Sequence, residues 1–292
     1  MSNVPASSRN FYLGCAVWSY KGWLGEFYPL KSRPQDFLQL YSQRLTAVEG
    51  NTTFYAVPNQ SIVARWAAET SPGFKFCPKF PKTVTHGGLL EPKIPEALSF
   101  IERIQGLEDR AGIIFAQLPP SYSPQSLKDL QEFLAALPAK EVDLALEVRH
   151  LDWFKSPYCE QLRDLLDELG IATVLLDTRP IYNCPDDPQL NSERRKPQVP
   201  LQPIVTGKRS LIRFISHPQS QYNEAYLSEW VDRVREWLAE GVQLYFFVHC
   251  PQEARSPHTA RTFQKFLEQK GVPIPPLPWD NIVPPSQQLS LF

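Results

Sequence analysis

The sequence predicts a single (β/α)8 TIM barrel, an α/β fold whose reactive groups lie at the carboxyl ends of the strands. Eight short apolar runs recur at near-regular spacing along the 292 residues, and helix-like segments separate them. This alternation implies parallel strands with helices outside. Most of the runs end in charged or polar residues, at the position that catalytic groups occupy in barrel enzymes.

Each predicted strand is short, and several are almost continuous in apolar residues. That pattern is typical of parallel strands covered on both faces. We expect the strands at Phe11–Val17, Ala47–Asn51, Phe74–Lys79, Gly112–Gln117, Val142–Val148, Ile171–Leu176, Ser210–Ile215 and Gln243–Val248.

Seven helices are expected between or after the strands, and an eighth, after the sixth strand, is poorly defined. Proline is tolerated in a first helical turn, which suits Pro34. Gly170, Gly241 and Gly271 stand just past three helices, where a left-handed cap is expected. The expected helices are Pro34–Arg44, Gln60–Glu69, Pro95–Gln105, Gln125–Leu137, Tyr158–Leu169, Glu224–Glu240 and Ala254–Lys270.

No linker divides the chain, so we expect a flexible amino terminus (1–10), one barrel (11–270) and a proline-rich, extended tail (271–292). A long proline-rich insert, Pro180–Gly207, follows the sixth strand and carries Arg194, Arg195 and Lys196. Loops of this length are functional or disordered, so the insert is either a mobile lid over the barrel mouth or a solvated loop.

Composition excludes some classes of binding partner and indicates the cellular compartment. Thirty basic residues balance thirty-one acidic ones, which argues against strong direct binding to nucleic acid or to an anionic membrane. The five cysteines are widely spaced without a Cys-x-x-Cys pair, as in reduced cytoplasmic proteins. No apolar signal segment opens the chain, and no apolar run approaches the roughly 20 residues that span a bilayer. We therefore expect a cytoplasmic protein.

Polar residues gather at the carboxyl face because the loops after parallel strands share one end of a barrel. All five histidines also fall on this face: His86, His150, His217, His249 and His258. The candidate catalytic residues are Glu49, Glu147 and Asp177. The candidate substrate-binding residues are Trp18, Asn51, Tyr55, Lys79, Gln117, Arg149, Trp153 and Arg213.

Three cations, Lys79, Arg149 and Arg213, indicate a site for an anion such as phosphate or carboxylate. Charges buried near a barrel axis are costly unless they are paired or serve a ligand. Glu49 and Glu147 in different surroundings could divide the roles of general acid and base. The alternative is that these groups are structural ion pairs that close the barrel mouth.

A divalent metal is a further alternative, held by Glu49, Glu147 and Asp177 with His249. Adjacent cations and the absence of His-x-His spacing disfavour it, so no cofactor is predicted. Neither a Gly-x-Ser-x-Gly elbow, a phosphate loop nor a dinucleotide fingerprint is present.

Five segments resemble the YecE-like family, a domain-of-unknown-function family of barrel proteins. They are Gly14–Pro29, Val48–Tyr55, Phe74–His86, Phe115–Tyr122 and Leu146–Phe154, and the resemblance spans roughly Phe11 to Leu267. It implies a barrel and supplies no reaction. The family motifs fall on Glu49, Asn51, Thr53, Phe54, Tyr55, Lys79, Gln117, Glu147, Arg149, Trp153, Asp177 and Arg213.

The chain departs from this resemblance at strands seven and eight. Relatives often show Arg-x-His-Gly on strand seven, where this chain has Arg213 followed by Ser216-His217-Pro218. Relatives usually carry an asparagine-rich end on strand eight, where this chain has His249-Cys250-Pro251. The roles of His217 and His249 therefore do not follow from the family.

The last residues resemble the short peptide by which bacterial polymerases and repair proteins bind the DNA sliding clamp. Gln288 would make the polar contacts, and Leu289, Leu291 and Phe292 would fill apolar pockets. A tail that folds back onto its own barrel, or one with no role, is the alternative.

Taken together, these features favour an enzyme, a hydrolase or lyase, acting on a small anionic substrate. The alternatives are a non-catalytic binding or adaptor barrel and a metal-dependent nuclease or phosphatase.

Overall fold

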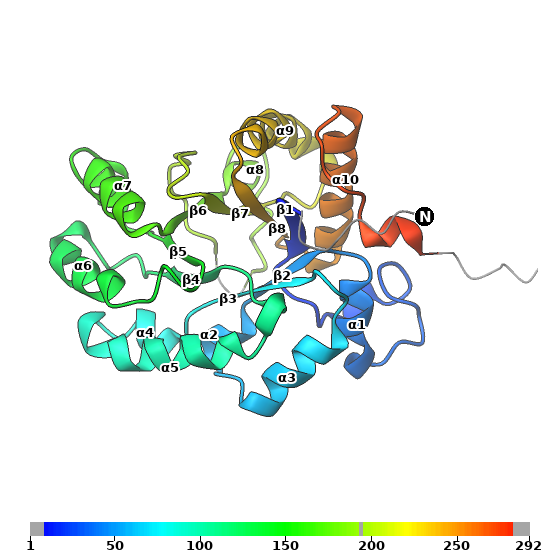
Figure 1. Cartoon of the computed structure of the whole chain (residues 1–292). Coiled ribbons are helices and arrows are strands. Elements are labelled where there is room, and N and C mark those ends of the chain that lie inside the picture. Colours follow the sequence, from blue (N-terminus) through cyan, green and yellow to red (C-terminus); the bar gives the residue numbers. More distant parts are fainter. Residues whose placement is uncertain (1–8, 193–194, 283–292) are drawn as a thin grey trace, which may run out of the picture.

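A computed structural model of the chain describes residues 9–192 and 195–282 and shows eight parallel strands surrounded by helices (Figure 1). The strand order is β3-β2-β1-β8-β7-β6-β5-β4. Isolated bridges from Phe76 to Ala111 and from Lys79 to Phe115 join β3 to β4 and complete the barrel. The strands are β1 (Phe11–Cys15), β2 (Ala47–Gly50), β3 (Lys75–Pro78), β4 (Ile114–Gln117), β5 (Leu144–Glu147), β6 (Ala172–Asp177), β7 (Arg209–Ile215) and β8 (Gln243–His249).

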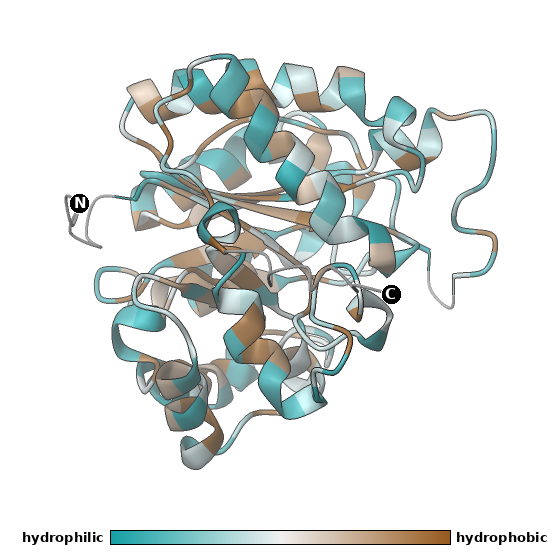
Figure 2. Ribbon diagram, turned by 90° about the vertical axis from the view of Figure 1, so that its right-hand side faces the viewer, coloured by the Kyte–Doolittle hydropathy of each residue, from teal (hydrophilic) through white to brown (hydrophobic). Residues whose placement is uncertain are grey.

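The helices form an outer layer, with apolar faces toward the strands and polar faces outward (Figure 2). They are α1 (Phe37–Ser42), α2 (Thr52–Tyr55), α3 (Gln60–Glu69), α4 (Lys82–Thr85), α5 (Ile94–Gln105), α6 (Leu127–Ala135), α7 (Tyr158–Leu169), α8 (Arg179–Tyr182), α9 (Glu224–Ala239) and α10 (Ser256–Gln269). The predicted α/β barrel is thus confirmed.

The expected element boundaries differ from the observed ones by a few residues. α3 and α7 begin and end where the sequence pattern predicts, and Gly170, Gly241 and Gly271 all have positive φ. Several strands are shorter than expected, because their last residues already turn into the loops at the barrel mouth.

The barrel interior follows the two-residue alternation of its strands. Ala47, Phe115, Ala145, Leu211 and Phe247 belong to one buried cluster inside the barrel. The residues two positions further along these strands form the next layer toward the carboxyl end, because side chains at i and i+2 share a face. That layer is polar and consists of Glu49, Gln117, Glu147, Arg213 and His249.

Gly14 in β1 lets neighbouring strands approach closely. A Cβ atom built at this position would lie 1.9 Å from the carbonyl oxygen of Ala47 and 3.1 Å from the ring of Phe247. A larger residue would push β1 away from β2, so glycine is required here for packing.

The insert after β6 crosses the carboxyl end of the barrel. The Tyr182 hydroxyl donates to the Lys196 carbonyl (2.5 Å), and the Lys196 amide donates to Gln189 Oε1 (2.7 Å). Gln202 Nε2 donates to the Phe154 carbonyl (2.9 Å), which ties the returning part of the insert to the segment after β5. These bonds hold Lys196 at the barrel mouth, while the mobility of the insert stays a prediction.

The chain after Gly271 differs from the extended tail that the prolines predict. It includes a short 3-10 helix, Pro278–Asn281, and Leu277 is fully buried. Trp279 packs against Phe27, with ring centroids 4.9 Å apart. Apolar burial therefore docks this segment on the barrel, whereas Gln288, Leu289, Leu291 and Phe292 lie outside the described residues.

Across the two stretches that the structure describes, no helix combines the length and the apolar character needed to cross a membrane.

Candidate functional site

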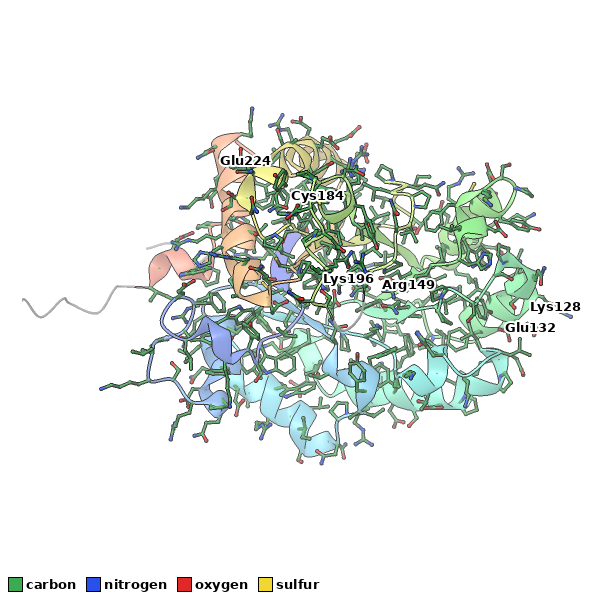
Figure 3. The ribbon with its side chains drawn as sticks, turned by 180° about the vertical axis from the view of Figure 1, so that it is seen from behind. Lys128, Glu132, Arg149, Cys184, Lys196 and Glu224 are labelled. Atoms are coloured by element: carbon green, nitrogen blue, oxygen red, sulfur yellow. The ribbon has the colours of Figure 1, made fainter. Side chains whose placement is uncertain are left out.

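A cavity of about 560 Å³ opens at the carboxyl end of the barrel. Its lining comes from the loops or ends of seven strands and from the insert after β6. Arg149 and Lys196 both reach toward the middle of the molecule, whereas Lys128 and Glu132 lie at its edge on α6 (Figure 3). The charged side chains in the lining are Lys79, Lys82, Arg149, Arg195, Lys196, Arg213 and Glu253.

Arg213 of β7 occupies the centre of the polar layer at the cavity floor. Its Nε and Nη2 donate to the two carboxylate oxygens of Glu49, at 2.9 and 2.8 Å. Its Nη1 donates to Glu147 Oε2 at 2.6 Å. Since all three side chains are buried, the guanidinium and the two carboxylates compensate each other away from water.

A second layer of contacts links Arg149 and Lys79 to this floor. Arg149 Nε donates to the other oxygen of Glu147 at 2.6 Å, and its Nη2 donates to Gln117 Oε1 at 2.5 Å. Lys79 Nζ donates to the same amide oxygen at 2.8 Å. Arg213 Nη1 also donates to this oxygen, at 3.5 Å, so one neutral side chain, Gln117, contacts three basic side chains.

The buried carboxylates are poorly suited to proton transfer near neutral pH. Burial by itself raises the pKa of Glu147, but Arg149 and Arg213 outweigh it and lower that pKa to about 2. Burial also opposes ionisation of Glu49, yet Arg213 and His249 hold its pKa well below the usual range. Both groups therefore remain charged and position the guanidinium groups.

His249 completes the floor from the end of β8. Its Nε2 lies 2.8 Å from Glu49 Oε2, and burial lowers its pKa to about 4. The imidazole is therefore neutral near pH 7 and donates a hydrogen bond to Glu49. His86 also lines the cavity, and its pKa is likewise lowered to about 4, first by burial and then by Lys79.

The structure adds two residues that the strand pattern does not single out as site residues, Glu253 and Lys196. Glu253 belongs to the 3-10 helix Glu253–Arg255 after β8, and burial raises its pKa to about 8 although nearby Ser256 and Lys196 lower it. Its Oε1 has no hydrogen-bond partner among the described residues. A signal for Glu253 was its place in a loop on the catalytic face, four residues after His249.

Five of the predicted site residues are absent from the cavity lining. Glu49 and Glu147 lie beneath it in the floor, bound to Arg213, whereas the other three, Asp177, Trp18 and Trp153, lie away from it. Asp177 accepts bonds from Arg179 and from Trp230 Nε1 (2.8 Å), which joins the end of β6 to α9. Val174 points into the barrel, so Asp177, three residues later, points outward. The expectation that Asp177 takes part in the same constellation is therefore wrong.

The tryptophans likewise pack outside the cavity lining. Trp18 contacts Trp66 and Phe76 edge to face, between the strands and α3. Trp153 is buried, and its Nε1 donates to the Tyr122 carbonyl at 2.9 Å. Burial of these large apolar rings against neighbouring elements stabilises them away from the barrel mouth. Neither ring therefore takes the substrate-binding position that the sequence predicts. The other predicted binding residues, Asn51, Tyr55, Lys79, Gln117, Arg149 and Arg213, do line the cavity.

The residues present do not fit the metal site that the sequence allowed. The oxygens of Glu49 and Glu147 already accept bonds from Arg213, and Asp177 lies elsewhere. Among the described residues, Cys184, Asp186 and His217 do approach one another within 4.8 Å. There, however, His217 Nδ1 accepts the Gln219 amide, which leaves the proton on Nε2 to bond Asp186 and no lone pair for a metal.

Comparisons with known proteins agree with this architecture. The profile of the family described as "Protein of unknown function DUF72" matches residues 12–281, almost the whole described chain. The chain belongs to the DUF72 family. UPF0759 protein YecE of Escherichia coli (strain K12) is 32% identical over 288 residues, covering 96% of this chain and 99% of that protein. UPF0759 protein YunF of Bacillus subtilis (strain 168) is 24% identical and covers 61% of each chain.

Solved structures of DUF72 proteins share the fold. One from Enterococcus faecalis has a TM-score of 0.67 at 18% identity, covering 88% of this chain and 95% of that chain. One from Thermotoga maritima has a TM-score of 0.63 at 23% identity, covering 88% of this chain and 99% of that chain. These similarities establish the barrel fold. The family description assigns no reaction, so the evidence on function comes from the cavity.

Proposed function

We propose that this DUF72 protein is an enzyme, a hydrolase or lyase, that binds a small anionic substrate in the cavity at the barrel mouth. The observation that carries the proposal is the charge of the lining. Six basic side chains and one carboxylate, that of Glu253, face the cavity among the described residues. Such an excess of cations in a partly enclosed site attracts phosphate or carboxylate groups.

Arg149 is the principal anion ligand in this proposal. Its Nε is bonded to Glu147, and one Nη nitrogen to Gln117, so the guanidinium is held in place before a ligand arrives. Lys196 enters from the insert, and burial lowers the pKa of its ammonium to about 8. A fixed guanidinium with a second cation beside it suits the spread charge of a phosphate or carboxylate.

Glu253 is the proton-transfer group in this proposal, in place of Glu49 and Glu147. Its pKa of about 8 lies near neutral pH, where a general acid or base works best. A partly exposed carboxyl beside cations, with one oxygen not yet bonded within the described part of the chain, favours an enzyme over an adaptor barrel. If the charges at the barrel mouth only stabilised the fold, the Glu253 carboxyl would be paired with a cation, as Glu49 is with Arg213.

Tyr55 and Asn51 supply the rim of the site. The Tyr55 ring is 70% exposed and lies against Phe54, while Asn51 is anchored through its Nδ2 to the Ala16 carbonyl at 3.2 Å. An exposed aromatic ring beside a cationic cavity offers a surface for the uncharged part of a substrate.

Ligand-induced stabilisation tests anion binding directly. The melting temperature should rise saturably with inorganic phosphate, with a nucleotide or with a dicarboxylate, because binding to the folded state alone stabilises it. Sodium chloride at matched ionic strength is the control for screening. If none of these anions raises the melting temperature above that control, the proposal fails. If an anion does stabilise the protein, mass spectrometry of anions released from the denatured, freshly purified protein would identify the substrate class.

A further inference from the structure

Lys79 has an unusual environment for a buried lysine. Its side chain is 5% exposed, and its Nζ lies 2.8 Å from Gln117 Oε1 and 3.8 Å from the centre of the Phe54 ring. Both partners are neutral. No carboxylate of the described residues lies within ion-pair distance of this amine, whereas Arg149 has one such partner and Arg213 has two. Buried ammonium groups are costly without such a partner.

The neighbours of Lys79 favour the neutral amine. Burial and the nearby Arg213 lower its pKa to about 7. A large fraction of the side chain therefore carries a lone pair at neutral pH. Desolvation together with an adjacent cation is the arrangement that makes a lysine nucleophilic in proteins.

We propose that Lys79 is the nucleophile of this cavity and forms an imine with the carbonyl carbon of a small substrate that also carries a carboxylate or phosphate. This inference rests on the proposed function, since Arg149 and Lys196 would bind the anionic group. It narrows the reaction to a lyase, because an iminium ion withdraws electrons from the bond next to the former carbonyl carbon.

The step balances without an oxidant, a reductant or a further co-reactant. The Lys79 amine attacks the carbonyl carbon, forming a C–N bond, and the oxygen takes up the proton that nitrogen loses. The C–O bond of this carbinolamine then breaks. The oxygen leaves as water with a proton from the Glu253 carboxyl, which leaves an iminium ion on Lys79 and a carboxylate on Glu253.

The fold places the two groups on different walls of the same cavity. Lys79 follows β3 and Glu253 follows β8, and β2 and β1 separate these strands in the sheet. A molecule bound between them would meet the amine on one side and the acid on the other. A cavity of about 560 Å³ has room for a small organic acid.

Reductive trapping tests the proposal on the full chain. The protein is incubated with glyoxylate or with pyruvate and treated with borohydride, which converts an imine to a stable secondary amine, and peptides are examined by mass spectrometry. Lys82 is the internal control, because it lines the same cavity but is exposed. At pH 7 we expect Lys79 to be modified at least tenfold faster than Lys82. The adduct on Lys79 should increase as pH rises through about 7.

Two outcomes would overturn the inference: no adduct on Lys79 with either probe, or equal modification of Lys79 and Lys82. Lys79→Met removes the nucleophile without adding a buried charge, so it should retain stabilisation by phosphate through Arg149 and lose the adduct. Phosphate stabilisation of the parent protein without a Lys79 adduct would reject the imine and leave the anion site standing. Absence of stabilisation by phosphate, by a nucleotide and by a dicarboxylate alike would instead reject the proposed function itself.

Discussion

Arg149 and Arg213 are joined by one carboxylate: Arg149 Nε bonds Glu147 Oε1 and Arg213 Nη1 bonds Glu147 Oε2, both at 2.6 Å. The two guanidinium groups, one from the segment after β5 and one from β7, are thereby held together at the cavity floor. Only Arg213 is further tied to Glu49. Of the two, Arg149 is therefore the one whose guanidinium still has hydrogen-bond donors available for a ligand.

Replacing Arg149 should weaken anion binding without unfolding the protein. In Arg149→Ala, Glu147 keeps its bond to Arg213, so no buried carboxylate is left uncompensated. We expect the apparent Kd for phosphate, measured by thermal shift, to rise at least about tenfold, or about 1.4 kcal/mol. Arg163→Ala removes an exposed cation on α7. This variant is the control and should bind phosphate like the parent. Equal binding by both variants would contradict this assignment.

Replacing Arg213 should instead unfold the barrel mouth. Arg213→Met leaves Glu49 and Glu147 buried without their shared cation, which should cost roughly 3–5 kcal/mol of unfolding free energy in urea titrations. Lys128→Ala breaks an exposed pair with Glu132 and should cost less than about 1 kcal/mol.

A combined variant checks the physical reason for the Arg213 effect. Adding Glu49→Gln and Glu147→Gln to Arg213→Met removes the uncompensated charges and should restore most of the lost stability. If the combined variant is as unstable as Arg213→Met alone, burial of the carboxylates is not the cause.

Glu253→Gln should change how stability depends on pH. The pKa of Glu253 is about 8 in the folded protein against an ordinary value of 4.5, so the folded state binds more protons between these values. The unfolding free energy of the parent should therefore fall as pH rises from about 4.5 to about 8.

Glu253→Gln has no carboxyl group at this position to titrate, so its unfolding free energy should not show this fall. We expect the fall in the parent to exceed that in the variant by about 2 kcal/mol, after allowance for partial solvent access. Urea titrations of both proteins at pH 5 and pH 8.5 measure the difference. Lys79 titrates in both proteins, so its contribution cancels in the comparison. Lys196 is coupled to Glu253, so the difference between the two proteins reports the titration of this pair. A difference that is the same at both pH values would rule out the raised pKa.

The carboxyl-terminal pentapeptide Gln288–Phe292 should bind a DNA sliding clamp. In this prediction, Leu289, Leu291 and Phe292 would be the apolar anchors of the peptide. The measurement is titration of a labelled tail peptide against the clamp of the organism that encodes this chain. The control peptide carries Leu291→Ala and Phe292→Ala, and binding that is no tighter than that of the control would reject the interaction.

Sequence periodicity by itself determined the barrel and much of the site. Parallel strands align their carboxyl ends, so the sequence alone places Glu49, Lys79, Gln117, Glu147 and Arg213 on one face. The grouping of Lys79, Arg149 and Arg213 in one predicted anion site followed from the same rule.

Only the tertiary structure decided which of these side chains are already bonded to other side chains and which are available for a ligand. Hydrogen-bond partners come from distant parts of the chain, as when Arg213 meets Glu49 and so lowers its pKa. Asp177 has the right residue type but points outward, a matter of strand register that the apolar run did not reveal. Burial of Lys79 and Glu253 depends on how several loops close together. Burial shifts a pKa through loss of solvent, which no local pattern of residues encodes.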